Sequence, residues 1–278
     1  QKISETLHRL VDEDSTFKVS RDVQTHELVV TGMSNLHLDV ILSRLKSRYG
    51  IDVESRQPKI PHKETITTKA SAQYKHKKQT GGKGQYGEVY LRIEPLERGG
   101  GFQFVSKIVG GAIPSQYIPA VEKGLRETIA KGILSNNPIV DVKVELYDGT
   151  FHNVDSSEAA FKVAASKAFH LAFDDAKPVL LEPVVNIEVT IPSEFMGEIT
   201  GNLSSRRGRV QGMDSFGDLQ VIQASIPMDE VKNYETELKS MTGGMGSYTM
   251  ELSHYDIVPS HLVPAIIAGA KKDAEKTD

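Results

Sequence analysis

A glycine-rich stretch has the spacing most suggestive of chemistry. Residues 82–87, with the sequence Gly-Lys-Gly-Gln-Tyr-Gly, satisfy the G-x-G-x-x-G pattern of phosphate-binding loops. A dinucleotide site needs a helix directly after this pattern, because the helix N-terminus receives the pyrophosphate. Residues 88–93 instead alternate as a strand does, and the sequence contains no P-loop and no D-F-G motif. We therefore expect no nucleotide site here, and neither dehydrogenase nor kinase activity.

A second group has the residue types of a hydrolase triad. His152, Asp155, Ser156 and Ser157 lie close together in the sequence. Triads are defined by spatial roles and usually assemble from distant segments, so Asp155 and the two serines are better explained as caps of the helix that follows. The other histidines are scattered without metal-ligand spacing. We expect no catalytic residue and no metal site.

Two short segments are basic although the chain as a whole is acidic, with 33 Lys+Arg against 37 Asp+Glu. Residues 69–85 carry several lysines with Tyr74 and Tyr86 close by, a mixture suited to phosphate contacts and to stacking on unpaired bases. Residues 204–209 carry arginines that can hold phosphates through two parallel hydrogen bonds. Either segment also fits an ordinary solvated basic loop. The lysines are Lys69, Lys75, Lys77, Lys78 and Lys83, and the arginines are Arg206, Arg207 and Arg209.

Length and composition indicate a globular chain of several domains. The 278 residues suggest two or three domains, with 38% hydrophobic and 25% charged residues. The absence of Cys fits a reducing compartment, and no apolar run reaches the roughly 20 residues of a membrane span. We expect a cytoplasmic protein without membrane contact. The chain also starts without Met and within a helical pattern, which suggests a fragment of a longer protein.

The first 60 residues predict most of a split βαβ unit. Apolar spacing indicates a helix over 3–13, followed by a hairpin of strands at 17–23 and 27–31. A second helix, with Asn35 as cap and Gly50 as its end, leads to a strand at 51–54. This order is a βαββαβ unit without its first strand, which strengthens the fragment interpretation.

The rest of the chain predicts a different middle domain and then a complete split βαβ domain. In the middle, a connector at 74–87 separates two strands, and Asp148-Gly149 is expected to form a turn. Residues 184–254 show the order β-α-β-β-α-β in full, and residues 259–278 form a short helix with a charged tail. The elements expected in the middle domain are strands 64–71, 88–93, 102–108 and 139–147, and helices 115–131 and 156–173.

Several long stretches, read in order, resemble translation elongation factor G, the ribosomal translocase, in its third, fourth and fifth domains. The similarity runs nearly from end to end of the chain. The matching stretches are 2–19, GMSNLHL at 32–38, TGGKGQYG at 80–87, 101–111, IPSQYIPAVEKG at 113–124, VDVKVELYDGTFHNVDSS at 140–157, PVLLEP at 178–183, SSRRGRVQGM at 204–213 and SMTGG at 240–244.

The resemblance implies an α+β architecture that is elongated and multidomain. Two ferredoxin-like split-βαβ domains, at 1–60 and 179–278, would flank a ribosomal-protein-S5-like α+β domain at 61–178, the arm that enters the decoding A site. The last of these domains would also carry the C-terminal helix. The first strand of the leading domain would lie before Gln1. GTP and Mg would bind to an upstream GTP-binding domain that is absent here, so this chain alone would be no enzyme and hold no cofactor.

The resemblance also implies two contact sites. Loops at the tip of the fourth domain would touch the tRNA–mRNA duplex, and the arginines Arg206, Arg207 and Arg209 would face rRNA at the stalk base. The tip residues are Gly81, Gly82, Lys83, Gly84, Gln85, Tyr86, Asp148, Gly149, His152, Asp155, Ser156 and Ser157.

The expected function is promotion of tRNA–mRNA translocation on the ribosome by a monomeric factor, with rRNA, the tRNA–mRNA duplex and stalk-base proteins as partners. Asn35, Met245 and residues 169–177 depart from the family's usual pattern, and residues 169–177 are similar to elongation factor G-like paralogues. One alternative is therefore a paralogue that works in ribosome recycling, with ribosome recycling factor as a partner. A second is a ribosomal protection protein.

Overall fold

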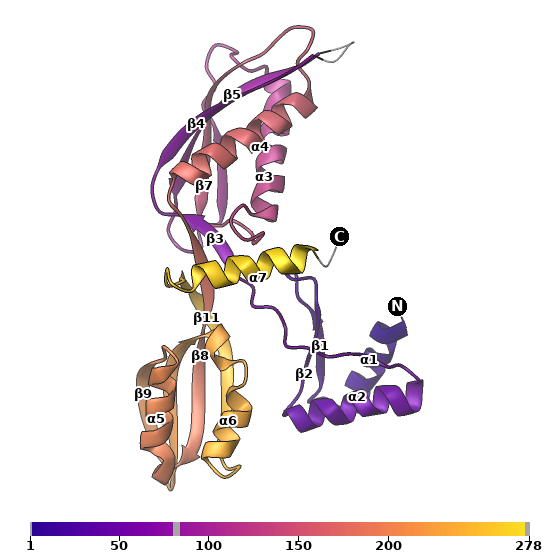
Figure 1. Cartoon of the computed structure of the whole chain (residues 1–278), viewed down its shortest axis with the longest axis vertical. Helices are drawn as coiled ribbons and strands as arrows, with labels where there is room; N and C mark the ends of the chain where they lie inside the picture. Colours follow the sequence, from indigo (N-terminus) through magenta and orange to yellow (C-terminus); the bar gives the residue numbers. More distant parts are fainter. Residues whose placement is uncertain (1, 80–83, 276–278) are drawn as a thin grey trace. The chain divides into compact units, whose positions relative to one another are not determined.

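The computed structural model describes residues 2–79 and 84–275. The chain divides into two compact units, Gln1–Pro61 with Pro183–His254 and His62–Glu182 with Tyr255–Asp278. Both combine helices with β-sheets (Figure 1), which confirms the expected α+β class. Within the described ranges, no helix is long and apolar enough to cross a membrane.

The N-terminal part is a β-hairpin covered by two helices. The strands β1 and β2 pair antiparallel, and their two flanking helices close over a small apolar core. The elements are α1 (Lys2–Glu13), β1 (Lys18–Arg21), β2 (Leu28–Thr31) and α2 (Asn35–Tyr49). The most buried core side chains are Leu10, Phe17, Ile41 and Leu45.

Two details of this part differ from the sequence prediction. Ser34, and not Asn35, caps α2, because its hydroxyl accepts the His37 N–H. Gly50 does end the helix, at φ +63°. Residues 51–54 form no strand, although Ile51 is buried. Alternating burial does not suffice for a strand, which also needs a neighbouring backbone to pair with, and β1 and β2 are the only described strands of this sheet.

The middle part is a four-stranded sheet with two helices on one face. Its strand order is β4-β5-β7-β6, in which β6 and β7 are parallel and the other neighbours antiparallel. Helices α3 and α4 pack against each other and cover the sheet (Figure 1). The elements are β3 (Lys63–Ile66), β4 (Ala70–Lys78), β5 (Gln85–Pro95), β6 (Phe102–Ser106), η1 (Ser115–Tyr117), α3 (Ile118–Lys131), β7 (Val142–Thr150) and α4 (Glu158–Asp175).

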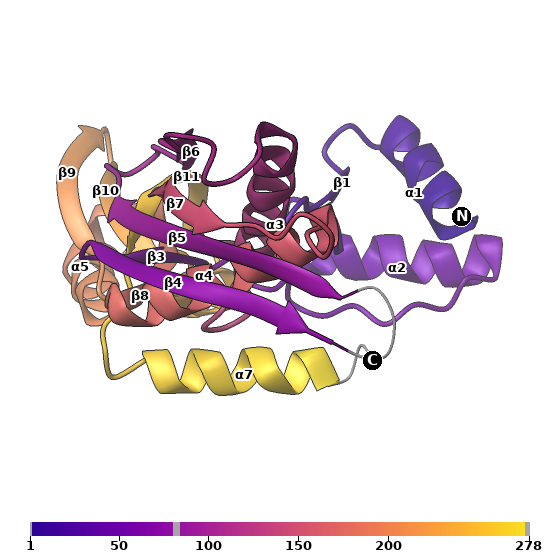
Figure 2. The ribbon, with the colours of Figure 1, turned by 90° about the horizontal axis from the view of Figure 1, so that it is seen from above.

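The predicted connector at 74–87 is wrong, because most of it is strand. β4 continues to Lys78, β5 starts at Gln85, and these two residues pair in a long antiparallel hairpin (Figure 2). The exposed lysines of β4 alternate with half-buried residues, and their polarity hid this period of two in the sequence. The predicted turn at Asp148-Gly149 is also wrong, because β7 continues through it to Thr150.

The C-terminal part confirms the complete split βαβ order. Its strands are arranged β11-β8-β10-β9, with the apolar side chains of β8 and β10 buried beneath the helices. The start of β8, at Pro178–Leu181, pairs instead with β3. The elements are β8 (Pro178–Pro192), η2 (Ser193–Phe195), α5 (Met196–Ser205), β9 (Arg209–Phe216), β10 (Leu219–Pro227), η3 (Met228–Val231), α6 (Tyr234–Met241), β11 (Ser247–Ile257) and α7 (Val263–Glu275).

Candidate functional site

Two loops that lie about 70 residues apart in sequence meet at one end of the middle sheet. The Tyr86 N–H donates to the Asp155 carbonyl at 2.9 Å, and the Ser156 hydroxyl donates to the Tyr86 carbonyl at 3.0 Å. The Gly84 N–H donates to the Asp155 carboxylate at 3.1 Å. These three bonds join the start of β5 to the segment that precedes α4. We call residues 84–86 together with 151–157 the tip.

The glycines of the tip serve close packing. A Cβ atom on Gly84 would lie 2.8 Å from the Asp155 carboxyl carbon, and one on Gly87 would lie 3.2 Å from the backbone of α4 at Ala160. The strand predicted after the glycines is confirmed as β5, so no helix N-terminus follows them. Gly81, Gly82 and Lys83, which were predicted to be part of this site, lie outside the described residues.

His152 is held by its own loop and exposes the rest of its ring. Its Nδ1 accepts the Asp155 N–H at 3.2 Å and the Val154 N–H at 3.3 Å, so the neutral ring carries its hydrogen on Nε2. The side chain is 53% exposed, and its ring centre lies 6.1 Å from that of Tyr86. The exposed part of His152 is therefore a hydrogen-bond donor.

The tip has no triad geometry. The Ser156 hydroxyl accepts the His152 backbone N–H at 2.9 Å and gives its own hydrogen to the Tyr86 carbonyl. No imidazole is placed to take that hydrogen. Ser157 caps α4 by accepting the Ala160 N–H, as predicted. Asp155, which was also predicted to be a cap, instead joins the two loops.

Gln85 and Tyr86 are positioned by strand neighbours that the sequence analysis did not single out. The Gln85 side-chain oxygen lies 2.9 Å from His76 Nε2, which leaves its amide NH₂ group as a donor. The Tyr86 hydroxyl lies 2.7 Å from that of Thr150. Both contacts are between neighbouring strands, so a correct register prediction would have found them.

Charged residues of the neighbouring strands continue the network of contacts that starts at Tyr86. The Thr150 hydroxyl donates to the Glu88 carboxylate at 2.6 Å, and Lys75 Nζ lies 4.0 Å from the same carboxylate. The Tyr86 hydroxyl and then the negative charge of Glu88 raise the pKa of Lys75. Lys75 therefore stays protonated. Asp148 and Gly149 lie in β7, beside Tyr90 and Val89, and not in the tip loops.

The three arginines after α5 have different surroundings. Arg206 is 17% exposed and bonds the Glu230 carbonyl, the Glu237 carboxylate and the Asn202 side chain. Arg207 Nε donates to the Glu230 carboxylate at 2.9 Å. Arg209 is exposed on β9. The structure therefore uses Arg206 to hold its own domain together and leaves Arg209 accessible.

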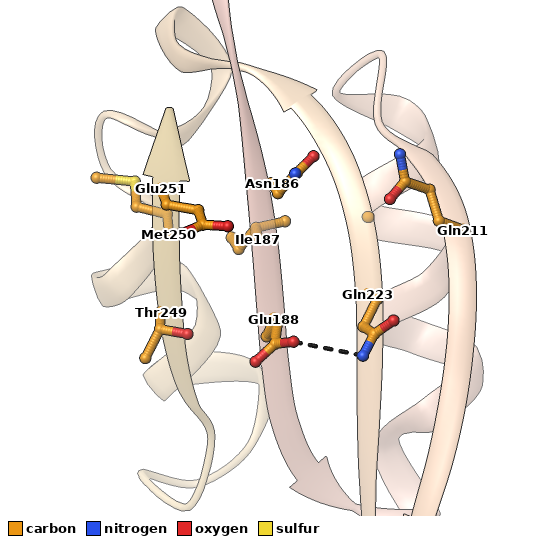
Figure 3. Close-up of a pocket in the computed structure, with 9 residues that line it drawn as sticks. Asn186, Ile187, Glu188, Gln211, Gln223, Thr249, Met250 and Glu251 are labelled. Atoms are coloured by element: carbon orange, nitrogen blue, oxygen red, sulfur yellow. Dashed lines mark hydrogen bonds between the residues drawn. The ribbon is translucent and has the colours of Figure 1, made fainter. Parts of the chain in front are cut away.

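A shallow hollow of about 330 Å³ lies on the face of the C-terminal sheet opposite its helices (Figure 3). Polar side chains dominate it, and Gln223 donates to the Glu188 carboxylate at 3.3 Å. Two carboxylates and no cation line it, so it does not favour an anionic ligand. The lining residues are Asn186, Ile187, Glu188, Gln211, Gln223, Ala224, Thr249, Met250 and Glu251.

Comparison with known families identifies the chain. The models of Elongation Factor G domain III, Elongation factor G domain IV and Elongation factor G C-terminus match residues 1–57, 58–177 and 179–266. This order of domains is that of a translation elongation factor. The chain belongs to the elongation factor G family, which confirms the resemblance and its fold.

The relatives are longer than this chain. All 278 residues are 47% identical to an elongation factor G-like protein from Thermotoga maritima, and they cover 41% of it. A crystal structure of a protein from Thermus thermophilus matches with a TM-score of 0.84 and 43% identity, over 98% of this chain and 40% of that one. The chain therefore spans about two fifths of the length of these relatives.

Proposed function

We propose that this chain is the ribosome-binding C-terminal part of an elongation factor G-type GTPase that promotes tRNA–mRNA translocation. The tip carries the proposal. Backbone and carboxylate hydrogen bonds fix its two loops, and its exposed side chains include two hydrogen-bond donors, Gln85 and His152. Membership of the elongation factor G family supports the choice of the ribosome as partner.

The chemistry of the tip suits RNA of any sequence. Amide and imidazole donors, with Lys78 exposed on the adjacent strand opposite Gln85, can bond phosphates and 2′-hydroxyl groups. Such contacts read the shape of a backbone and not the base edges. A factor that moves every codon needs this kind of contact. We propose the tRNA–mRNA duplex as the partner of the tip.

We propose that GTP and Mg bind outside this chain. The sequence has no P-loop, and among residues 2–79 and 84–275 no three His, Asp or Glu side chains gather as a metal site would require. We assign GTP hydrolysis to another part of a longer protein. In that protein, GTP hydrolysis in another domain would drive a rearrangement of the domains, and the domains of this chain would convert it into movement of the tRNA–mRNA duplex.

The further partners follow from the same proposal. Arg209 is the accessible arginine for rRNA or protein at the stalk base, whereas Arg206 positions the loop that carries it. The protein would work in the cytoplasm as a monomer.

The direct test replaces two exposed donors of the tip in the full-length protein. Gln85→Ala with His152→Ala should slow translocation at least tenfold and leave the rate of ribosome-stimulated GTP hydrolysis within about twofold. Rapid kinetics with a fluorescent mRNA gives the first rate, and phosphate release gives the second. His8→Ala, at an exposed histidine of α1, is the matched control and should change neither rate.

Two results would overturn the proposal. Translocation at the wild-type rate by the double variant would remove the role of the tip. A wild-type protein that moves no mRNA, yet splits post-termination ribosomes together with ribosome recycling factor, would establish the recycling alternative instead.

A further inference from the structure

The face of the middle sheet opposite α3 and α4 differs in character from the face that the helices cover. Side chains alternate along β5, so that Val89, Leu91 and Ile93 enter the helix-covered core while Tyr90 and Arg92 lie on the other side. The same alternation along β4 and β7 adds polar residues to this side. We call it the open sheet face.

The ion pairs of Glu145 and Glu88 on the open sheet face are layered, with the carboxylate inside and the cation outside. The Glu145 side chain is 7% exposed, whereas its partners Arg92, at 3.0 Å, and Lys107 are 45% and 59% exposed. The Glu88 side chain is 9% exposed and that of Lys75 is 51% exposed. The hydrogen bond from Lys107 holds the pKa of Glu145 below its usual value, so Glu145 stays charged. An incoming molecule therefore meets the cations first.

Cations also outnumber carboxylates on this face. Lys77 is exposed and has no carboxylate partner among the described residues, while Lys69 and Lys143 share Glu94. Two positive charges are in excess here, although the chain as a whole carries a net charge of −4. The cations are Lys69, Lys75, Lys77, Arg92, Lys107 and Lys143, and the carboxylates are Glu88, Glu94, Glu145 and Asp148.

Tyrosines lie between these cations. The Tyr90 and Tyr147 rings contact edge to face at 6.0 Å, and the Arg92 guanidinium lies 4.9 Å above the Tyr147 ring. Lys75 Nζ lies 5.3 Å from the centre of the Tyr86 ring. Tyrosine hydroxyls bond sugar and phosphate oxygens, and a guanidinium held flat on a ring presents two donors in a fixed plane. This combination fits nucleic acid better than it fits a carboxylate-rich protein surface.

We infer that the open sheet face binds the phosphodiester backbone of RNA, as a second RNA contact separate from the tip. The inference rests on the proposed function only in taking ribosomal RNA as the natural source of that backbone. Arg92, Lys107 and Lys77 bind phosphates, and the tyrosines between them bond sugar oxygens. The tip engages one RNA segment while this face holds another.

The test measures the salt dependence of binding for two variants of the full-length protein. Lys77→Gln, Arg92→Gln and Lys107→Gln together remove three phosphate contacts. The negative slope of log affinity against log salt concentration should therefore become shallower by about 2. Lys77→Glu alone keeps every ion pair of the fold and should weaken binding severalfold. Lys123→Gln, Lys131→Gln and Lys167→Gln, on the helices of the opposite face, form the matched control and should leave the slope unchanged.

Two probes separate this inference from the proposed function. Vacant ribosomes test both, whereas a fluorescent 20-nucleotide poly(U) RNA tests RNA binding without a ribosome, and Gln85→Ala with His152→Ala measures the share of the tip in that binding. Weaker poly(U) binding by both variants, with the reduced salt dependence of the triple variant, supports the inference even if the wild type moves no mRNA. Wild-type slopes on both probes in both variants would overturn it and leave translocation untouched. Equal binding of poly(U) and poly-glutamate would overturn the assignment to RNA.

Discussion

Asp155 shows how one side chain organises the tip. Its carboxylate accepts the Gly84 N–H from a loop 71 residues away in sequence, and its backbone N–H supports His152. Asp155 was predicted to belong to the tip and to cap the helix that follows. The structure gives it a positioning role, because it holds groups that would touch RNA without being the most exposed group itself.

Asp155→Ala should loosen the tip. The lost hydrogen bond contributes about 1 kcal/mol at this half-exposed loop, so amide exchange at residues 84–86 should become about fivefold faster. Translocation should slow several-fold while GTP hydrolysis stays unchanged. Hydrogen exchange by mass spectrometry, with translocation kinetics on the same samples, measures both effects.

Two further variants decide whether position or mere charge matters at Asp155. Asp155→Asn keeps an oxygen that can accept the Gly84 N–H. Its changes in amide exchange and in translocation rate should therefore be less than half as large as those of the alanine variant. Asp174→Ala removes an exposed carboxylate of α4 and should behave as wild type. Equal effects of all three variants would show that net charge, and not the tip geometry, is responsible.

The ring and the hydroxyl of Tyr234 have opposite effects on the stability of the fold. Its hydroxyl is fully buried and has no hydrogen-bond partner among the described residues, and burial raises its pKa to about 12. The ring itself packs well, edge to face with Tyr248 at 5.4 Å. The hydroxyl therefore costs stability, while the ring contributes it.

Tyr234→Phe should raise the free energy of unfolding by about 1 kcal/mol at neutral pH, because a buried unpaired donor is removed. The advantage should grow with pH. Unfolded Tyr234 loses its proton near its usual pKa of about 10 and the native residue only near 12, so wild-type stability falls across this interval. Urea unfolding followed by circular dichroism at pH 8 and pH 11 measures the difference. A variant less stable than wild type at pH 8 would contradict the assignment of an unpaired hydroxyl.

At the scale of elements, helix approach depends on a glycine. A Cβ atom on Gly124 of α3 would lie 2.6 Å from the Lys162 carbonyl oxygen of α4, a contact that no side-chain movement can relieve. Gly201 of α5 has open space at the same position. Two helical glycines thus have opposite surroundings.

Gly124→Ala should destabilise the middle part by about 1–3 kcal/mol, because α3 and α4 must move apart. Gly201→Ala should stabilise α5 by about 0.5–1 kcal/mol, because alanine loses less backbone freedom in a helix. Thermal unfolding of both variants beside wild type gives the comparison. Equal changes of the same sign would show that the close approach of the two helices is unimportant.

The accuracy of the sequence analysis differed between elements for physical reasons. The split βαβ order of residues 184–254 was predictable because its strands bury one face and its helices have a clear apolar side. The extension of β4 to Lys78 was hidden, since its outward positions hold lysines and its period of two had little apolar contrast. The strand predicted at 51–54 failed for the opposite reason, because the pattern was present without a partner strand.

The sequence predicted which residues belong to the candidate site better than it predicted the contacts between them. Gln85, His152 and Asp155 were identified through the resemblance. The contacts of His76 with Gln85 and of Thr150 with Tyr86 depend on strand register, which the misplaced turn at 148–149 concealed. The roles of Arg206 and Arg209 could not be separated by sequence, because both lie in one basic run and only packing distinguishes them.

At the scale of the whole molecule, the chain combines three domain types of one family in an uninterrupted order. It spans about two fifths of the length of its relatives, and its sequence contains no P-loop. In the proposed function, RNA contact and GTP hydrolysis therefore belong to different parts of the full-length protein. We propose that these domains touch the ribosome and its RNA, and that a domain elsewhere in the full-length protein supplies the GTPase.

Toeprinting of mRNA on pre-translocation ribosomes tests this central claim most directly. With GTP, the full-length protein should shift the toeprint by one codon, and Gln85→Ala with His152→Ala should shift it at least tenfold more slowly while hydrolysing GTP at the wild-type rate. A toeprint that stays in place with the wild-type protein, under conditions in which it hydrolyses GTP on the ribosome, would contradict the account.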